Sequence, residues 1–115
     1  MASSSPDHLK IVRECYRAYE TGDRSLIEPH LSGDFTFYSP DDVGIDRAKY
    51  FERCWPNSKL IETFTFKRLI EAGDEVTVTY ESKKKNGSRF CNTEIHTFDG
   101  DKICRVEVYY GWDLR

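Results

Sequence analysis

The sequence predicts an α+β domain in which three N-terminal helices pack on a curved antiparallel sheet. Two patterns predict this class. Apolar residues recur at helical spacing early in the chain, and four segments of alternating character follow, separated by short turn sequences. The chain has 115 residues, the usual size of one domain. We therefore expect residues 7–115 to form a single domain, preceded by a disordered tail over residues 1–6.

The first predicted helix begins after Asp7, a favoured N-cap residue, and ends at Gly22. Its apolar face is formed by Ile11, Val12, Cys15, Tyr16 and Tyr19. A short second helix carries Leu26, Ile27 and Leu31 and ends before Gly33. Asp46 caps a third helix from Arg47 to about Cys54.

The rest of the chain predicts β-structure. Residues 35–39 alternate as a short strand, and Pro40 stops it. Four longer segments follow: Leu60–Ile70, Glu75–Lys84, Arg89–Phe98 and Lys102–Trp112. The joints between them are Ala72-Gly73-Asp74, Asn86-Gly87 and Asp99-Gly100-Asp101. Each joint is a hairpin signal, so the four segments form an antiparallel meander.

The register of the meander decides which side chains face inward, because a slip of one residue exchanges the two faces. We take the first and third joints as three-residue loops, which puts Phe64, Phe66 and Ile70 on one face with Val76, Val78 and Tyr80. A strict two-residue turn at Asn86-Gly87 would bury Arg105 and Glu107, which is unfavourable. We therefore predict a three-residue loop or a bulge there.

In this register Glu94 and His96 point into the apolar face, beside Val106, Val108 and Tyr110. Residues two apart on a strand lie about 7 Å apart on one face, so the pair could share a ligand. Burial raises a carboxyl pKa and lowers an imidazole pKa, which favours proton transfer near neutral pH. Two alternatives stay open: the pair could only satisfy each other's hydrogen bonds, or both could lie on the surface.

Composition excludes several functional classes. The net charge is −3, and acidic and basic residues are mixed along the chain, without the basic excess that is typical of nucleic-acid-binding proteins. No apolar run approaches the roughly 20 residues of a membrane span, and the start lacks the features of a signal peptide. The four cysteines are dispersed, so we expect reduced thiols in a cytoplasmic protein. A zinc site of Cys91, His96 and Cys104 has no short ligand spacing and is disfavoured, and no other cofactor is predicted.

The order of these elements resembles the nuclear transport factor 2-like superfamily, and within it the SnoaL-like proteins. The resemblance rests on Ala18–Asp23, Leu31–Phe35, Ser39-Pro40 and Phe98–Ile103, in this order and spacing. It implies a cystatin-like cone, in which helices close one side of a bent sheet around a pocket, and it implies a homodimer through the sheet. It also points Val12, Cys15 and Tyr19 inward from the first helix, and Phe37 and Ser39 inward from the first strand.

The resemblance extends to ketosteroid isomerase, a protein of similar fold, but this chain lacks two of the three catalytic residues of that enzyme. Cys15 stands where that enzyme has a tyrosine, and Ser39 where it has its base. Only Glu94 falls on an acidic position, that of the neutral aspartic acid. A serine does not abstract a carbon-bound proton unaided, so this isomerase activity is not expected.

Two functions are therefore predicted. The first is binding of a small apolar molecule, with acid–base catalysis of the isomerase, cyclase or hydrolase type by Glu94 and His96, and with Tyr19 or Tyr110 donating to a developing oxyanion. The second is a non-catalytic module that binds a ligand, dimerises or holds a protein partner. The predicted pocket lining comprises Val12, Cys15, Tyr19, Phe37, Ser39, Tyr50, Trp55, Tyr80, Val108 and Tyr110.

Overall fold

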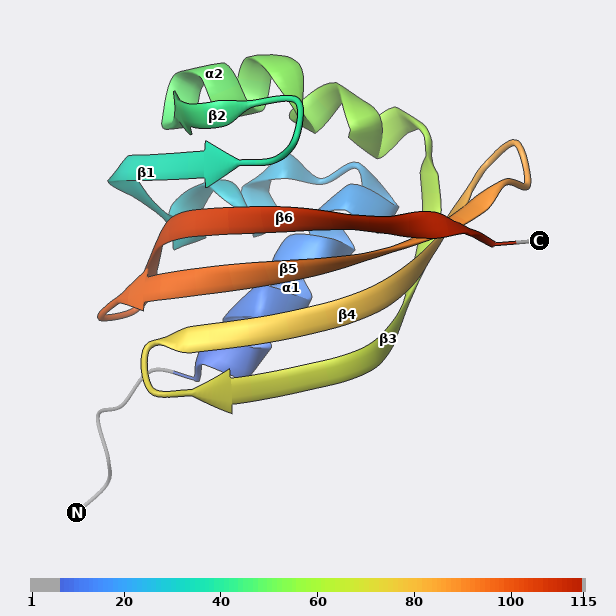
Figure 1. Cartoon of the computed structure of the whole chain (residues 1–115). Coiled ribbons are helices and arrows are strands. Elements are labelled where there is room, and N and C mark those ends of the chain that lie inside the picture. Colours follow the sequence, from blue (N-terminus) through green and yellow to red (C-terminus); the bar gives the residue numbers. More distant parts are fainter. Residues whose placement is uncertain (1–6, 115) are drawn as a thin grey trace.

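The computed structural model describes residues 7–114, so the predicted tail over residues 1–6 lies outside the described residues. Six strands form one sheet in the order β2-β1-β6-β5-β4-β3. Figure 1 shows the helix α1 (His8–Thr21) running across one face of this bent sheet, while α2 (Arg47–Arg53) stands over β1 (Leu31–Tyr38) and β2 (Val43–Asp46). The predicted fold class is confirmed.

The first helix has the ends that the sequence predicts. The Asp7 side chain accepts a hydrogen bond from the Lys10 backbone N–H at 3.1 Å. Gly22 ends the helix with φ at 70°, in the left-handed region that a residue without Cβ adopts at little cost. Between these ends, Val12, Cys15, Tyr16 and Ala18 are buried against the sheet.

Removing the N-cap of α1 is expected to have a modest effect. In Asp7→Ala the Lys10 N–H loses its side-chain partner, and the free energy of unfolding should fall by about 1 kcal/mol. Urea denaturation of the variant and the wild type measures this difference. Asp7→Asn is the matched control, because asparagine caps nearly as well. Equal losses in the two variants would mean that the cap contributes nothing.

The second helix differs from the prediction. Two 3-10 turns, η1 (Arg24–Leu26) and η2 (Glu28–His30), replace it, and Leu31 begins β1. Pro29 explains the break, because proline cannot donate the backbone hydrogen bond that continues a helix. The first strand is consequently longer than residues 35–39 at its start, and Ser39 lies just beyond its end. The short strand β2 was not predicted. The third helix is α2, followed by η3 (Trp55–Lys59).

The predicted meander is present as β3 (Ile61–Ala72), β4 (Glu75–Lys84), β5 (Arg89–Asp99) and β6 (Lys102–Leu114). At the Asn86-Gly87 joint the Lys84 N–H donates to the Ser88 carbonyl at 2.8 Å, which leaves a three-residue loop. Val78 therefore lies opposite Glu94, and Val76 lies opposite His96. The register prediction at this joint is confirmed, and with it the inward direction of both polar residues.

The other two joints are shorter than predicted. Ala72 pairs with Glu75 and Asp99 pairs with Lys102, so each turn has two residues. Bulges compensate: one follows Phe66 in β3 and one interrupts the pairing of β5 with β6 after Thr97. The prediction for Ile70 was wrong as a result. The two-residue turn pairs Ile70 with Thr77 on the outer face, where Ile70 is 54% exposed, while Leu69 packs against the core. The bulge then returns Phe66 to the inner face, opposite Tyr80.

The interior face of the sheet forms the core with α1. Phe35, Val12, Val76, Val78 and Ile103 are almost fully buried there. The opposite face is polar: Thr79 bonds Thr93, and Arg105 bonds Glu107. Association of two copies through this face stays a prediction. Within residues 7–114, no helix has the length and apolar character needed to cross a membrane.

Candidate functional site

A cavity of about 810 Å³ lies between α1, the inner face of the sheet and the α2–η3 segment. Most of the predicted lining residues reach it, namely Cys15, Tyr19, Phe37, Ser39, Tyr50, Tyr80, Val108 and Tyr110. Val12 does not line the cavity, because its side chain is fully buried between α1 and the sheet. Trp55 packs its ring against Tyr19, with centroids 5.1 Å apart, and also lies outside the lining. The volume is within the range of small-molecule sites.

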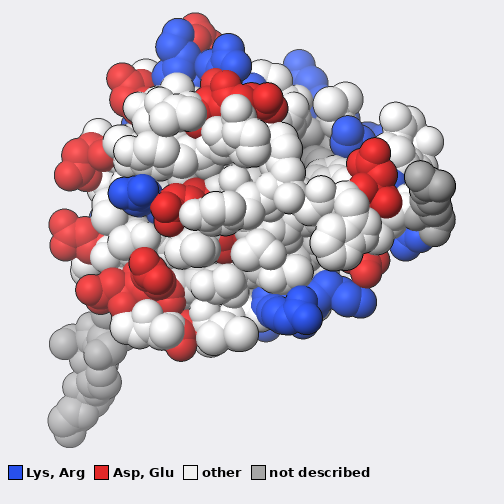
Figure 2. Space-filling view, in the orientation of Figure 1, with Lys and Arg blue, Asp and Glu red and all other residues white. Residues whose placement is uncertain are grey.

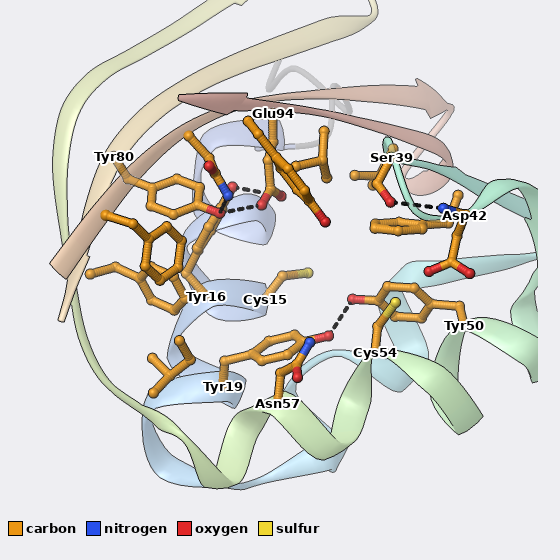
Figure 3. Close-up of a pocket in the computed structure, with 18 of the residues that line it drawn as sticks. Cys15, Tyr16, Tyr19, Ser39, Asp42, Tyr50, Cys54, Asn57, Tyr80 and Glu94 are labelled. Carbon is orange, nitrogen blue, oxygen red and sulfur yellow. Dashed lines mark hydrogen bonds between the residues drawn. The ribbon is translucent and has the colours of Figure 1, made fainter. Parts of the chain in front are cut away.

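Glu94 is held at the wall of this cavity by two phenol groups (Figure 3). The Tyr16 hydroxyl donates to its Oε1 at 2.9 Å, and the Tyr80 hydroxyl donates to its Oε2 at 2.6 Å. Tyr16 comes from α1 and Tyr80 from β4, so the helix and the sheet meet at this carboxyl group. The side chain of Glu94 is 17% exposed, which leaves part of it open to the cavity.

His96 is the fourth member of the Glu94 cluster and contacts both Tyr16 and Glu94. Its Nε2 lies 3.2 Å from the Tyr16 hydroxyl and 3.7 Å from Glu94 Oε1. Burial lowers the pKa of His96 from 6.5 to about 4, because an imidazolium would lose its hydration. The ring is therefore neutral at pH 7. Its Nδ1 is buried and has no hydrogen-bond partner among the described residues.

Two opposing effects set the protonation of Glu94. Burial raises its pKa above the ordinary value, while the hydrogen bonds from Tyr80 and Tyr16 lower it by favouring the carboxylate. Burial is the larger of these effects, so the net direction is upward. The two phenols respond in the same direction: burial and the neighbouring Glu94 raise the pKa of Tyr16 and of Tyr80. A carboxyl group perturbed in this way inside a cavity is a candidate for proton transfer.

A second pair of phenols lies on the opposite side of the cavity. The hydroxyls of Tyr19, from α1, and Tyr50, from α2, are 2.7 Å apart, and Figure 3 shows this contact facing the Glu94 cluster across the open space. Burial raises the pKa of both hydroxyls, so both stay protonated at neutral pH. The pair can therefore donate a hydrogen bond into the cavity.

Two thiols and one hydroxyl that line the cavity, those of Cys15, Cys54 and Ser39, are not activated as nucleophiles. Burial raises the pKa of the Cys15 thiol far above its ordinary value and that of Cys54 to about 12. Neither thiol is a thiolate at neutral pH, which is the reactive form. Ser39 Oγ accepts the backbone N–H groups of Asp41 and Asp42 at 3.2 and 3.1 Å, and so supports the turn after β1.

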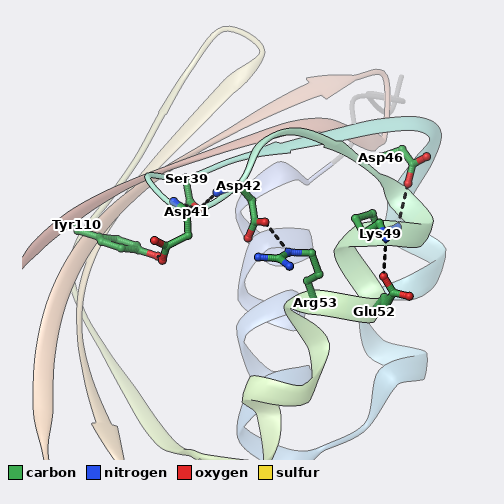
Figure 4. Close-up of polar contacts among 8 residues, drawn as sticks. All are labelled: Ser39, Asp41, Asp42, Asp46, Lys49, Glu52, Arg53 and Tyr110. Atoms are coloured by element: carbon green, nitrogen blue, oxygen red, sulfur yellow. Dashed lines mark hydrogen bonds and ion pairs between the residues drawn. The ribbon is translucent and has the colours of Figure 1, made fainter.

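The mouth of the cavity carries charged and exposed aromatic groups. Arg53 pairs with Asp42, and the Tyr110 hydroxyl donates to Asp41 at 2.8 Å (Figure 4). Trp112 lines the mouth and is 71% exposed. Figure 2 shows acidic and basic side chains interspersed over the outer face of the sheet. The cavity lining also contains charged residues of both signs, namely Asp41, Asp42, Arg53, Lys84 and Asp113.

Two residues of the site escaped the sequence analysis. Tyr16 stands on the apolar face of the first helix, where its spacing is that of any core residue. Asn92 is not among the residues that the sequence predicted for the site. Its Nδ2 donates to the Tyr80 hydroxyl at 3.2 Å, and its Oδ1 accepts the Gly111 N–H at 3.2 Å. The available signal was its position two residues before Glu94 on the same inward face.

No group of three or more His, Cys, Asp and Glu side chains within residues 7–114 is arranged to hold a metal ion. The thiols considered for zinc have other contacts. Cys91 donates to the Trp112 carbonyl at 3.5 Å, and Cys104 donates to the Thr97 carbonyl at 3.4 Å.

Solved structures of the same fold are numerous. An NTF2-like protein from Anabaena variabilis is 22% identical with a TM-score of 0.74, covering 98% of this chain and 96% of that one. TerC, co-crystallised with polyporic acid, is 16% identical with a TM-score of 0.74, covering 90% and 91%. An LEH-like epoxide hydrolase from M. tuberculosis is 13% identical with a TM-score of 0.75, covering 90% and 82%.

At these identities the likeness establishes the fold alone. Comparison with curated proteins finds no match. The SnoaL-like domain family, in contrast, matches this sequence over residues 12–106. That range includes most of α1, the strands β1 to β5 and the whole Glu94 cluster, and on this evidence the chain belongs to the SnoaL-like domain family of the nuclear transport factor 2-like superfamily.

Proposed function

We propose that the cavity binds a small, mostly apolar molecule with a carbonyl, enol or hydroxyl group, and that Glu94 exchanges a proton with it. The observation that carries this proposal is the placement of one carboxyl group at the cavity wall, fixed by Tyr16 and Tyr80 and still partly open to the interior. The surrounding walls are largely apolar, so a bound molecule would bring few waters with it.

The Tyr19–Tyr50 pair supports an acid–base reaction on an oxygen-bearing ligand. Of the two phenols predicted to donate to an oxyanion, Tyr19 has the better position, because its hydroxyl faces the cavity next to Tyr50. Tyr110 is half-exposed at the mouth, and its hydroxyl is already engaged with Asp41. Proton exchange at Glu94 and hydrogen-bond donation from the opposite wall together suit reactions in which negative charge develops on oxygen.

Proteins of the same fold make this kind of ligand reasonable. The structures similar to this chain include an epoxide hydrolase and a protein crystallised with polyporic acid. Epoxides and polyporic acid are small organic molecules, so these proteins support the cavity as the binding site. The chemistry depends on this chain's own side chains.

A screen of small aromatic ketones and phenols by thermal unfolding tests the binding proposal. A ligand of the folded state raises the unfolding midpoint of the wild type. Val108→Phe, which places a ring in the cavity, should abolish that rise. Val43→Phe is the matched control, because Val43 is exposed outside the cavity, and it should retain the rise. A ligand that stabilises all three proteins equally binds elsewhere and contradicts the proposal.

Glu94→Gln then separates proton exchange from binding alone. For a ligand that the wild type converts, we expect turnover to fall about 100-fold, the lower end of what a positioned acid or base contributes, while the thermal shift persists. Unchanged turnover would remove Glu94 from the chemistry. Ligands that bind both proteins without any turnover would leave the second predicted function, a non-catalytic binding module.

A further inference from the structure

We infer that hydrogen-bond directions give the cavity a fixed polarity, in which Glu94 only accepts and the Tyr19–Tyr50 pair donates, so that the ligand is a hydroxy-ketone-type molecule. Its acidic hydrogen, on an enol or phenol oxygen, would face Glu94, and its carbonyl oxygen would face the two tyrosines. This inference rests on the proposed function and specifies the ligand of the same site. The assignment of the ligand follows from which acceptor is available to each hydroxyl hydrogen that lines the cavity.

The direction of the Tyr80–Glu94 contact is fixed by Asn92. The Gly111 N–H donates to Asn92 Oδ1, so the amide nitrogen Nδ2 is the atom that faces the Tyr80 hydroxyl. An amide N–H cannot accept a hydrogen bond. The single hydroxyl hydrogen of Tyr80 therefore has one available acceptor, which is Glu94 Oε2 at 2.6 Å.

The direction of the Tyr16–Glu94 contact is fixed by His96. A neutral imidazole has one N–H, and only Nε2 has a partner. If the hydrogen were on Nδ1, it would be a buried donor without an acceptor, which is costly. With the hydrogen on Nε2, His96 donates to the Tyr16 oxygen. Tyr16 must then donate its own hydrogen to Glu94 Oε1 at 2.9 Å.

Both oxygens of Glu94 are consequently acceptors of a phenol hydrogen. Two such bonds favour the carboxylate against the effect of burial. This direction is opposite to the one that the comparison with ketosteroid isomerase implies for the same position, where a neutral acid donates. Asn92 and His96 act here as positioning residues, since they touch Glu94's donors and orient them.

The opposite wall has a hydrogen to spare. Tyr19 and Tyr50 carry two hydroxyl hydrogens, and their mutual contact at 2.7 Å uses one. The second has no acceptor within residues 7–114, although Tyr50 is only 7% exposed. A hydroxyl that already accepts a hydrogen bond is a stronger donor. The ligand atom that meets this wall is therefore one with lone pairs, such as a carbonyl oxygen.

The titration of Glu94, followed by ¹³C NMR of its side-chain carboxyl carbon, tests the acceptor side without any ligand. The titratable groups that face Glu94 are Cys15, Tyr16 and Tyr19 of α1, Tyr50 of α2, Cys54, Tyr80 of β4 and His96 of β5. We expect a carboxylate at pH 7 in the wild type. In His96→Leu the Tyr16 oxygen loses its hydrogen-bond donor and Tyr16 can turn away from Glu94, so the midpoint of Glu94 titration should rise by about one pH unit. His96→Gln keeps an N–H donor for Tyr16, so its midpoint should equal that of the wild type.

Thr93→Val, on the outer face of the same strand, is the control and should leave the titration unchanged. A neutral Glu94 at pH 7 in the wild type, or equal midpoints in His96→Leu and His96→Gln, would overturn the acceptor assignment. Neither result bears on whether the cavity binds ligands, so the inference can fail while the proposed function stands.

Three matched probes test the ligand class: 6-hydroxy-2-acetylnaphthalene, its methyl ether, and 2-ethyl-6-hydroxynaphthalene. The hydroxy-ketone should bind about tenfold more tightly than either analogue, which lacks the acidic hydrogen or the carbonyl oxygen. The double variant Tyr19→Phe/Tyr50→Phe, which removes both hydroxyl hydrogens of this wall, should remove the advantage over the ethyl compound only, and Glu94→Gln the advantage over the ether only. Equal affinity for the three probes would overturn the assigned polarity, and failure of all three to bind would overturn the ligand class.

Discussion

Lowering the pH from 7 to 4 is expected to destabilise this protein by about 3 kcal/mol through His96 alone. The cause is burial: the pKa of His96 is about 4 in the folded chain against an ordinary value of 6.5. Between these two values the unfolded chain binds the proton and the folded chain does not. Each pH unit in that window is worth about 1.4 kcal/mol. The loss begins as the pH falls below 6.5 and is complete near 4.

Urea denaturation of His96→Gln across the same pH range measures this contribution. The variant keeps a side-chain N–H for Tyr16 but does not titrate, so its unfolding free energy should fall by about 3 kcal/mol less than that of the wild type. His30→Asn is the control. His30 is partly exposed and lies 2.6 Å from Glu14, outside the buried cluster. If wild type and His96→Gln lose stability in parallel, the imidazole is not buried as the structure has it.

Glu94 acts against His96 in part of this window. Its folded-state pKa is raised, so the folded chain takes up a proton more readily than the unfolded chain. The group therefore favours the folded state at low pH, and this contribution is lost as the pH rises through its folded pKa. Glu94→Gln should consequently make the loss of stability on acidification steeper. The opposite signs of two groups 3.7 Å apart distinguish this cluster from a general acid effect.

The inward direction of Glu94 and His96 was predictable because charge and apolar residues alternate along the last two strands. Burying Arg105 and Glu107 instead would be costly, and this cost favours a three-residue loop at the central joint. The turns at either side were predicted less well. A two-residue turn with a bulge and a three-residue loop differ near the turn, at Ile70, and place the same residues inward beyond the bulge, at Phe66 and Phe64. Bulges leave little trace in a single sequence.

The contact of Tyr16 with Glu94 and His96 could not be predicted from the sequence. Helical spacing placed it on the buried face, and nothing in the spacing distinguishes a phenol that packs from one whose hydroxyl meets a carboxyl group. Its partners, Glu94 and His96, are 78 and 80 residues away in the chain. Their meeting depends on the packing of α1 against the sheet, which a local pattern does not determine. The same holds for Tyr19 and Tyr50, which come from different helices.

Gly111→Ala is expected to destabilise the protein by about 3 kcal/mol, the upper end of the range for overpacking, although Gly111 itself is exposed. A Cβ at this position would lie 2.3 Å from the Cys91 carbonyl oxygen and 2.8 Å from its Sγ. The nearest atom belongs to the backbone of β5, so a side-chain rotation cannot relieve the contact. The clash would separate β5 from β6 beside the bulge between Phe90 and Asn92.

The consequence for the site distinguishes this substitution from general strain. Gly111 orients Asn92, and Asn92 orients Tyr80 toward Glu94, so Gly111→Ala should also raise the midpoint of Glu94 titration. Gly33→Ala is the matched control, since Gly33 lies in β1 and a Cβ there meets nothing within 4 Å. Urea denaturation compares the variants. A loss below about 1 kcal/mol in Gly111→Ala would show that β6 can shift away, and the close approach of these two strands would then not be what fixes the Glu94 donors.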